Sequence, residues 1–227
     1  MLLSFACSLK AQPAKGTVTV NARQDLLSVL PAEAAYFLTR FEEAVIYFTD
    51  GTTSSGTVNI CLVDNSIRFI APAGDTLLMS HGDRILRILV SDTLILKAND
   101  YFARQIAVFG PYSLSERKSL ELDVLQEKKT GAYGSVPPTS TAMSANLMLL
   151  DPSRKFEAAT DISYSMKSEY VLTDGTDVYK ARAAAFCRLF PEKKREIKKF
   201  IKEQSLDMES RTDLLRLFLF CADNDKQ

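Results

Sequence analysis

Residues 45–62 read VIYFTDGTTSSGTVNICL, and this stretch decides the fold because two strand patterns flank a tight turn in it. Four β-forming residues at 45–48 lead into Asp50-Gly51, a dipeptide that readily supplies the positive φ of a hairpin turn. Beyond the turn, apolar side chains occupy every second position from 58 to 62, so they share one face of a strand. The stretch predicts a β-hairpin with one apolar face.

The same pattern continues toward the C-terminus as far as residue 126. Turn signals separate further strand segments, which are 67–70, 76–79, 85–90, 93–97, 101–109 and 120–124. The connections are too short for parallel crossovers, which need a dozen or more residues, so neighbouring strands pair antiparallel. We therefore expect an antiparallel meander of about eight strands with one face on a core, forming either an open barrel or a sandwich.

Apolar residues recur at helical spacing near the C-terminus. The pattern predicts a hairpin that turns at Asp174-Gly175 and then three short helices. Pro191 ends the first helix and is well placed to begin the second, and Ser210 is a plausible N-cap of the third. Together with the meander, this pattern predicts an α+β fold.

Glycines, prolines and a Ser/Thr cluster between the strand-rich and helical parts indicate a loop or linker. The predicted parts are a truncated signal peptide at 1–11, an antiparallel β domain at 12–126, a linker at 127–160, and a hairpin with a helical segment at 161–227.

Composition excludes several classes of protein. The 227 residues carry 28 Lys+Arg against 28 Asp+Glu and are 46% hydrophobic, which is too apolar and too weakly charged for a disordered tail. Charge balance also excludes the strongly basic domain typical of nucleic-acid binders. Since no later apolar run approaches the roughly 18 residues of a membrane-spanning helix, we predict no transmembrane span.

The first eleven residues favour export. A short apolar run at 2–6 ends in small and polar residues, as at the end of a secretory signal peptide, although the basic start is missing. An ordinary N-terminal segment is the alternative. Acylation of Cys7, as in a lipoprotein, is less favoured because Ser4 stands where an aliphatic residue is expected. The expected location is periplasmic or outer-membrane-associated.

The cysteines and the single histidine do not indicate a catalytic or metal-binding site. Cys61, Cys187 and Cys221 are interpreted as small core residues, with a Cys187–Cys221 disulfide as the alternative in an oxidising compartment. No Cys-x-x-Cys motif or Cys/His cluster exists in the sequence, so we predict neither a metal site nor a cofactor. His81, the only histidine, lies in a predicted surface turn.

A run of basic residues at 192–202 is the one candidate binding feature. Its cations are Lys193, Lys194, Arg195, Lys198, Lys199 and Lys202. They predict a patch for anionic partners such as lipid headgroups. The alternative is a solvated helix face with weak ion pairs, which is common on amphipathic helices.

Carboxylates and one repeated turn sequence are weaker candidates for a catalytic or calcium site. Glu42, Glu43 and Asp161 are available for acid–base chemistry, but acidic residues beside strands are usually solvated. Thr-Asp-Gly-Thr occurs twice, at 49–52 and 173–176, which favours repeated turn chemistry over calcium binding.

Two blocks of sequence resemble a family of uncharacterised exported proteins of Bacteroidota. They are Tyr47–Gly51 with Ser55-Gly56, Ile67–Ile70 and Gly74–Leu77, and the ending Ala185–Pro191 with the lysine-rich helix and Asp213–Leu215. The resemblance spans about residues 41–220. It implies an envelope location. The family has no established activity or catalytic residues, so the resemblance assigns no functional residue to this chain.

The expected function is a non-enzymatic binding or structural module of the cell envelope. Its partner would be a protein or a glycan, or anionic lipid headgroups. The alternative is a periplasmic hydrolase that works through carboxylates.

Overall fold

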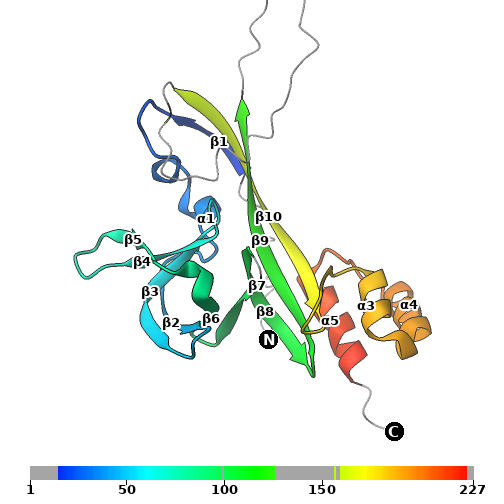
Figure 1. Ribbon diagram of the computed structural model, residues 1–227. Helices are drawn as coiled ribbons and strands as arrows, with labels where there is room; N and C mark the ends of the chain where they lie inside the picture. The colour runs from blue at the N-terminus through cyan, green and yellow to red at the C-terminus, as the bar shows by residue number, and fades with distance from the viewer. Residues whose placement is uncertain (1–14, 99, 126–155, 157–158, 224–227) are drawn as a thin grey trace, which may run out of the picture.

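A single antiparallel sheet forms the body of the protein, and three helices pack at one end of it (Figure 1). The computed structural model describes residues 15–98, 100–125, 156 and 159–223. The predicted signal peptide, Cys7 and most of the predicted linker lie outside the described residues.

The strands are β1 (Lys15–Val20), β2 (Glu42–Phe48), β3 (Thr53–Cys61), β4 (Ser66–Ile70), β5 (Thr76–Leu78), β6 (Ile85–Val90), β7 (Thr93–Ala98), β8 (Tyr101–Phe109), β9 (Tyr112–Leu125), β10 (Thr160–Thr173) and β11 (Val178–Lys180). Their order in the sheet is β1-β10-β9-β8-β7-β6-β2-β3-β4-β5, and β11 pairs with the end of β10.

The α+β class and the antiparallel pairing are confirmed, but the expected number of strands is too low for the whole sheet. Eight strands lie between residues 42 and 125, and β1, β10 and β11 join them from outside that range. The sheet is not closed into a barrel within the described residues, because β1 and β5 end it on either side.

One connection breaks the simple meander. β2, β3, β4 and β5 follow one another outward, but β6 returns to pair with the other edge of β2. The chain makes this return through a short 3-10 helix, η2 (Gly82–Arg84). As a result β5 is left as an edge strand.

The two longest strands, β9 and β10, run through the centre of the molecule (Figure 1). They pair antiparallel from Asp161 opposite Leu125 to Thr173 opposite Ser113. β1 covers only the first half of β10 and β11 only its last three residues, Val171 to Thr173.

The helices cover the end of this long pair. They are α3 (Ala183–Leu189), the 3-10 turn η3 (Pro191–Lys193), α4 (Lys194–Glu203) and α5 (Arg211–Ala222). Leu114 of β9 and Leu172 of β10 lie opposite each other and are fully buried against α3, α4 and α5. Burial of apolar side chains on both partners therefore fixes the helices on the sheet.

The predicted helix boundaries are confirmed at two residues. Pro191 begins η3, which leads directly into α4. Ser210 caps α5, because its hydroxyl accepts a hydrogen bond from the backbone N–H of Asp213 at 3.4 Å.

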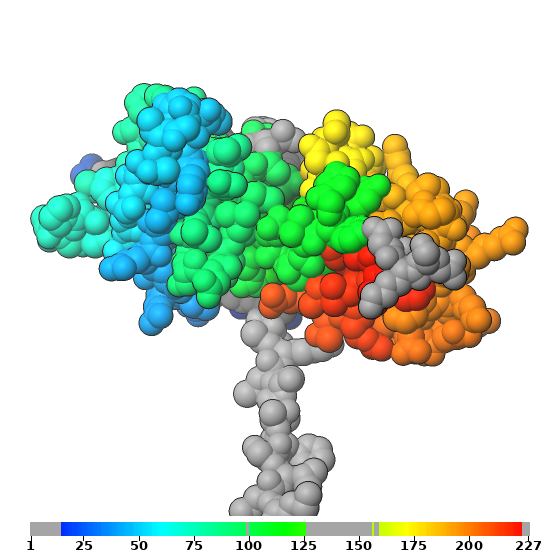
Figure 2. Space-filling view, turned by 90° about the horizontal axis from the view of Figure 1, so that it is seen from below, coloured from blue at the N-terminus to red at the C-terminus, as the bar shows by residue number. Residues whose placement is uncertain are grey.

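Two further apolar clusters stabilise the strand-rich part. One lies among β2, β3, β6, β7 and β8 around Ile46, Ile88 and Ile95. The other joins β1, β9 and β10 to the N-terminal segments η1 (Leu26–Ser28) and α1 (Ala32–Ala35). Seen from below, the strand-rich part and the helices form two sides of the molecule (Figure 2).

The two Thr-Asp-Gly-Thr sequences make the same turn. Asp50 accepts a backbone hydrogen bond from Thr52 at 3.0 Å, and Asp174 accepts one from Thr176 at 2.9 Å. Gly51 and Gly175 have φ of 84° and 90°, which only glycine adopts without strain. This confirms the interpretation as turn chemistry.

Candidate functional site

The basic face of α4 consists of the exposed cations Lys194, Arg195, Lys198, Lys199 and Lys202. Ile197 is buried, and Phe200 and Ile201 are partly buried against the helical core, so most of the apolar side of α4 is covered. Lys194, Lys198 and Lys202 follow at intervals of four residues, which aligns them along one side of a helix. The fold thus gathers five of the six predicted residues on one outward face.

Lys193 is the exception to the predicted patch. Its side chain is only 7% exposed, and its ammonium donates a hydrogen bond to the backbone carbonyl of Cys221 at the end of α5. Lys193 belongs to η3 rather than to α4, so it does not follow the spacing of the helix. A cation at a helix C-terminus satisfies a free carbonyl and the helix dipole, which is a structural role.

Most of the basic face has no internal partner. Lys199 lies 3.8 Å from Glu203, and both side chains are largely exposed, so this ion pair contributes little to stability. Among the described residues, Lys194, Arg195, Lys198 and Lys202 contact no carboxylate. These charges therefore remain available to an external anion.

A depression of about 370 Å³ opens beside the basic face, between α3 and α4. Its lining residues are Ala183, Ala184, Cys187, Arg188, Lys194 and Lys198. We call this feature the α3–α4 depression. Sequence reasoning missed Arg188 because it lies on another helix, outside the basic run.

The Arg188 guanidinium stacks on a neighbouring aromatic ring. It lies 4.8 Å from the ring centroid of Tyr179, whose hydroxyl donates a hydrogen bond to Asp177 at 3.0 Å. Such a cation–π contact restricts the arginine. The same guanidinium also interacts electrostatically with the Asp174 carboxylate, whose pKa it helps to lower.

The predicted acid–base residues are not brought together. Glu42 and Glu43 belong to β2 and Asp161 belongs to β10, with four strands between them in the sheet. Asp161 accepts a hydrogen bond from Thr19 at 2.6 Å, and Glu42 lies 3.7 Å from Arg40. Within the described part of the chain, no group of three or more His, Cys, Asp or Glu side chains has the arrangement of a metal site.

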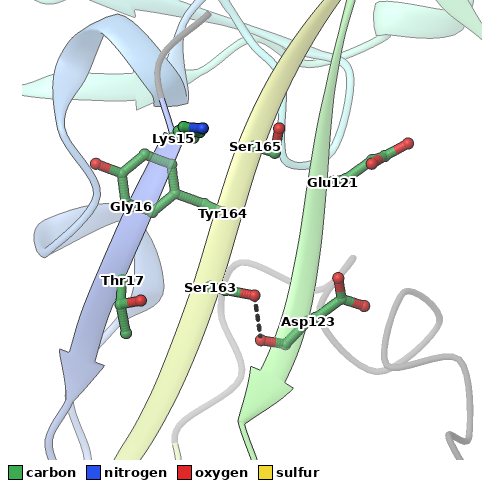
Figure 3. Close-up of a pocket in the computed structure, with 8 residues that line it drawn as sticks. All are labelled: Lys15, Gly16, Thr17, Glu121, Asp123, Ser163, Tyr164 and Ser165. Carbon is green, nitrogen blue, oxygen red and sulfur yellow. Dashed lines mark hydrogen bonds between the residues drawn. The ribbon is translucent and has the colours of Figure 1, made fainter.

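Another depression, of about 420 Å³, lies over β1, β10 and β9 (Figure 3). Hydroxyls of Thr17, Ser163 and Ser165 share it with Glu121 and Asp123. It is a shallow, open surface, and Lys167 already pairs with Glu121 at 2.6 Å. The depression lacks the enclosed, converging polar groups expected of an active site.

The cysteines and the histidine have structural surroundings. Cys61, Cys187 and Cys221 are buried free thiols, in agreement with their interpretation as core residues. Burial raises the pKa of Cys61 to about 11 and that of Cys221 to about 12, which disfavours the reactive thiolate. His81 lies exposed in the turn before η2, with a φ of 58°.

The edge strand β5 offers a different kind of surface. Leu77 and Leu78 are 46% and 56% exposed, and one side of the strand has no neighbour in the sheet among the described residues. An open edge with exposed leucines is the type of surface that pairs with a strand of another protein.

Comparison with protein-family models, curated proteins and solved structures found no match to this chain. Among the described residues, none of the helices has the length and hydropathy needed to span a membrane.

Proposed function

We propose that this protein is an exported, non-enzymatic binding module of the cell envelope, and that the basic face of α4 binds the anionic surface of a membrane. The observation that carries the proposal is the set of cations on one outward side of α4, four of which contact no described carboxylate. The sequence resemblance to exported proteins supports the location.

The binding mode follows from how α4 sits in the fold. Interfacial helices that insert into a bilayer need an exposed apolar face. In α4 that face packs into the helical core through Ile197, Phe200 and Ile201. The contact with the membrane is therefore electrostatic, and it weakens as salt shortens the range of the charges.

The alternative of a hydrolase has less support. Glu42 and Glu43 lie on β2 and Asp161 lies on β10, with four strands between them, so the three carboxylates do not meet in one pocket. A role in binding fits the shallow depressions and the solvent-facing charges better.

Charge reversal on α4 tests the proposal. The double substitution Lys198→Glu and Lys199→Glu changes four charges, and each is worth about 1 kcal/mol near an anionic bilayer, so affinity should fall by several hundredfold. The measurement is co-sedimentation with vesicles of phosphatidylcholine and phosphatidylglycerol.

A matched control separates local from overall charge. Lys15→Glu with Arg40→Glu changes the net charge equally, at exposed positions in the strand-rich part of the chain. We expect this variant to bind as the wild type does. Equal binding by the α4 variant and the wild type would refute the proposed function.

A further inference from the structure

The α3–α4 depression is lined by three cations and three small apolar residues. Ala183, Ala184 and Cys187 have small side chains, and they leave a space of about 370 Å³ between the two helices. This is well above the roughly 10–15 Å³ of such space that a single water molecule needs. The depression can therefore hold a small ligand group and not only single waters.

Charge defines the ligand class. Arg188, Lys194 and Lys198 line the depression, and none of its described lining residues carries a carboxylate. A phosphomonoester carries about −1.5 to −2 charges at pH 7, whereas a phosphodiester carries one. Three cations match the phosphomonoester better. Arginine adds a planar fork of donors that fits two phosphate oxygens, and each lysine adds a point charge.

The site is partly arranged before a ligand arrives. Tyr179 holds the Arg188 guanidinium by stacking at 4.8 Å, which lowers the entropy lost on binding. Lys194 is the first residue of α4, so the N-terminal turn of α4 borders the depression.

We propose that the α3–α4 depression binds the phosphomonoester headgroup of a membrane lipid. The inference rests on the proposed function, because the depression shares Lys194 and Lys198 with the basic face of α4. It adds selectivity: the basic face binds any anionic bilayer, and the depression prefers a terminal phosphate.

The test compares two kinds of vesicle with equal surface potential, one containing phosphatidic acid and the other phosphatidylglycerol. The wild type should bind phosphatidic acid vesicles more tightly, by about fivefold or more, the equivalent of one additional charge contact. Arg188→Gln with Lys194→Gln should remove this preference.

The control variant is Arg195→Gln with Lys202→Gln. Like the depression variant, it removes two exposed positive charges. Both of them lie on α4, and neither lines the depression. The affinity of this variant should fall equally for both kinds of vesicle, and its preference for phosphatidic acid should remain. All four positions are exposed, so urea unfolding should show stabilities within about 0.5 kcal/mol of the wild type.

The outcomes separate this inference from the proposed function. A wild type without preference, or a control variant that loses it as fully as the depression variant, would overturn the inference, although vesicle binding itself would persist. If the wild type binds neither kind of vesicle, the proposed function itself is refuted. Glycerol 3-phosphate, at the concentration of accessible phosphatidic acid, should leave the protein on vesicles, and complete displacement would overturn the assignment to a lipid.

Discussion

Lys193 and Lys194 are neighbours in the sequence with opposite roles in the structure. The ammonium of Lys193 is buried against the carbonyl of Cys221, whereas Lys194 faces the solvent. The sequence identified both as cations of one run, but only the three-dimensional turn at η3 separates them. Arg188 shows the converse case, since it joins the basic site from a helix that the run does not include.

This difference predicts unequal effects on stability. Lys193→Ala removes a buried donor and leaves the carbonyl of Cys221 without its hydrogen bond, which should cost about 1–3 kcal/mol. Lys194→Ala, at an exposed position, should stay within about 0.5 kcal/mol of the wild type. Urea unfolding measures both. Equal stabilities would contradict the buried position of Lys193.

At the scale of single elements, the hairpin turns at 49–52 and 173–176 are each held by hydrogen bonds to an aspartate of the repeated Thr-Asp-Gly-Thr sequence. Thr52 donates to Asp50 through its hydroxyl and its backbone N–H, and both hydrogen bonds lower the pKa of that carboxyl. The backbone N–H groups of Asp177 and Thr176 lower the pKa of Asp174 in the same way. The charged carboxylates thus stabilise both turns.

These lowered pKa values set the sign of a pH effect. The carboxylates contribute stability above their ordinary pKa of about 4, and this contribution is lost as the pH falls through the lower folded values. A variant with Asp50→Asn and Asp174→Asn should therefore lose less stability between about pH 6 and pH 3 than the wild type does. The measurement is the urea midpoint at each pH.

Two exposed aspartates outside these turns provide the control. Asp75→Asn with Asp83→Asn removes the same number of carboxylates without touching either turn. The control should keep the wild-type pH dependence. If both double variants flatten it equally, the turns are not its source.

Elements that follow local rules are predictable from sequence, and the others depend on distant partners. The hairpins and the cap at Ser210 rest on neighbouring residues, so pattern and turn chemistry suffice. β1 was missed because its partner β10 lies more than a hundred residues away, without a connecting turn signal. β9 is longer than expected because Glu116 and Lys118 occupy the alternate positions between Leu114 and Leu120 and so interrupt the apolar alternation.

At the scale of the whole molecule, the arrangement of the sheet decides what reaches the surface. The return of β6 to β2 leaves β5 at an edge, and the insertion of β10 between β1 and β9 brings the C-terminal helices to the end of the long strands. Hydrophobic periodicity predicts neither the pairing of β6 with β2 nor the position of β10 between β1 and β9. Other pairings of the same strands would fit the alternation of apolar residues equally well. The basic run was visible in the sequence, but its outward direction follows from the packing of Ile197.

The central claim is that the basic face of α4 is the part of the protein that meets an anionic bilayer. An environment-sensitive fluorophore on Lys199→Cys tests it most directly, with Arg40→Cys as the matched position on the strand-rich side and the labelled wild type as background. Vesicles of phosphatidylglycerol should shift the emission at position 199 and leave position 40 unchanged. A shift at position 40 alone, or at neither position, would contradict the account.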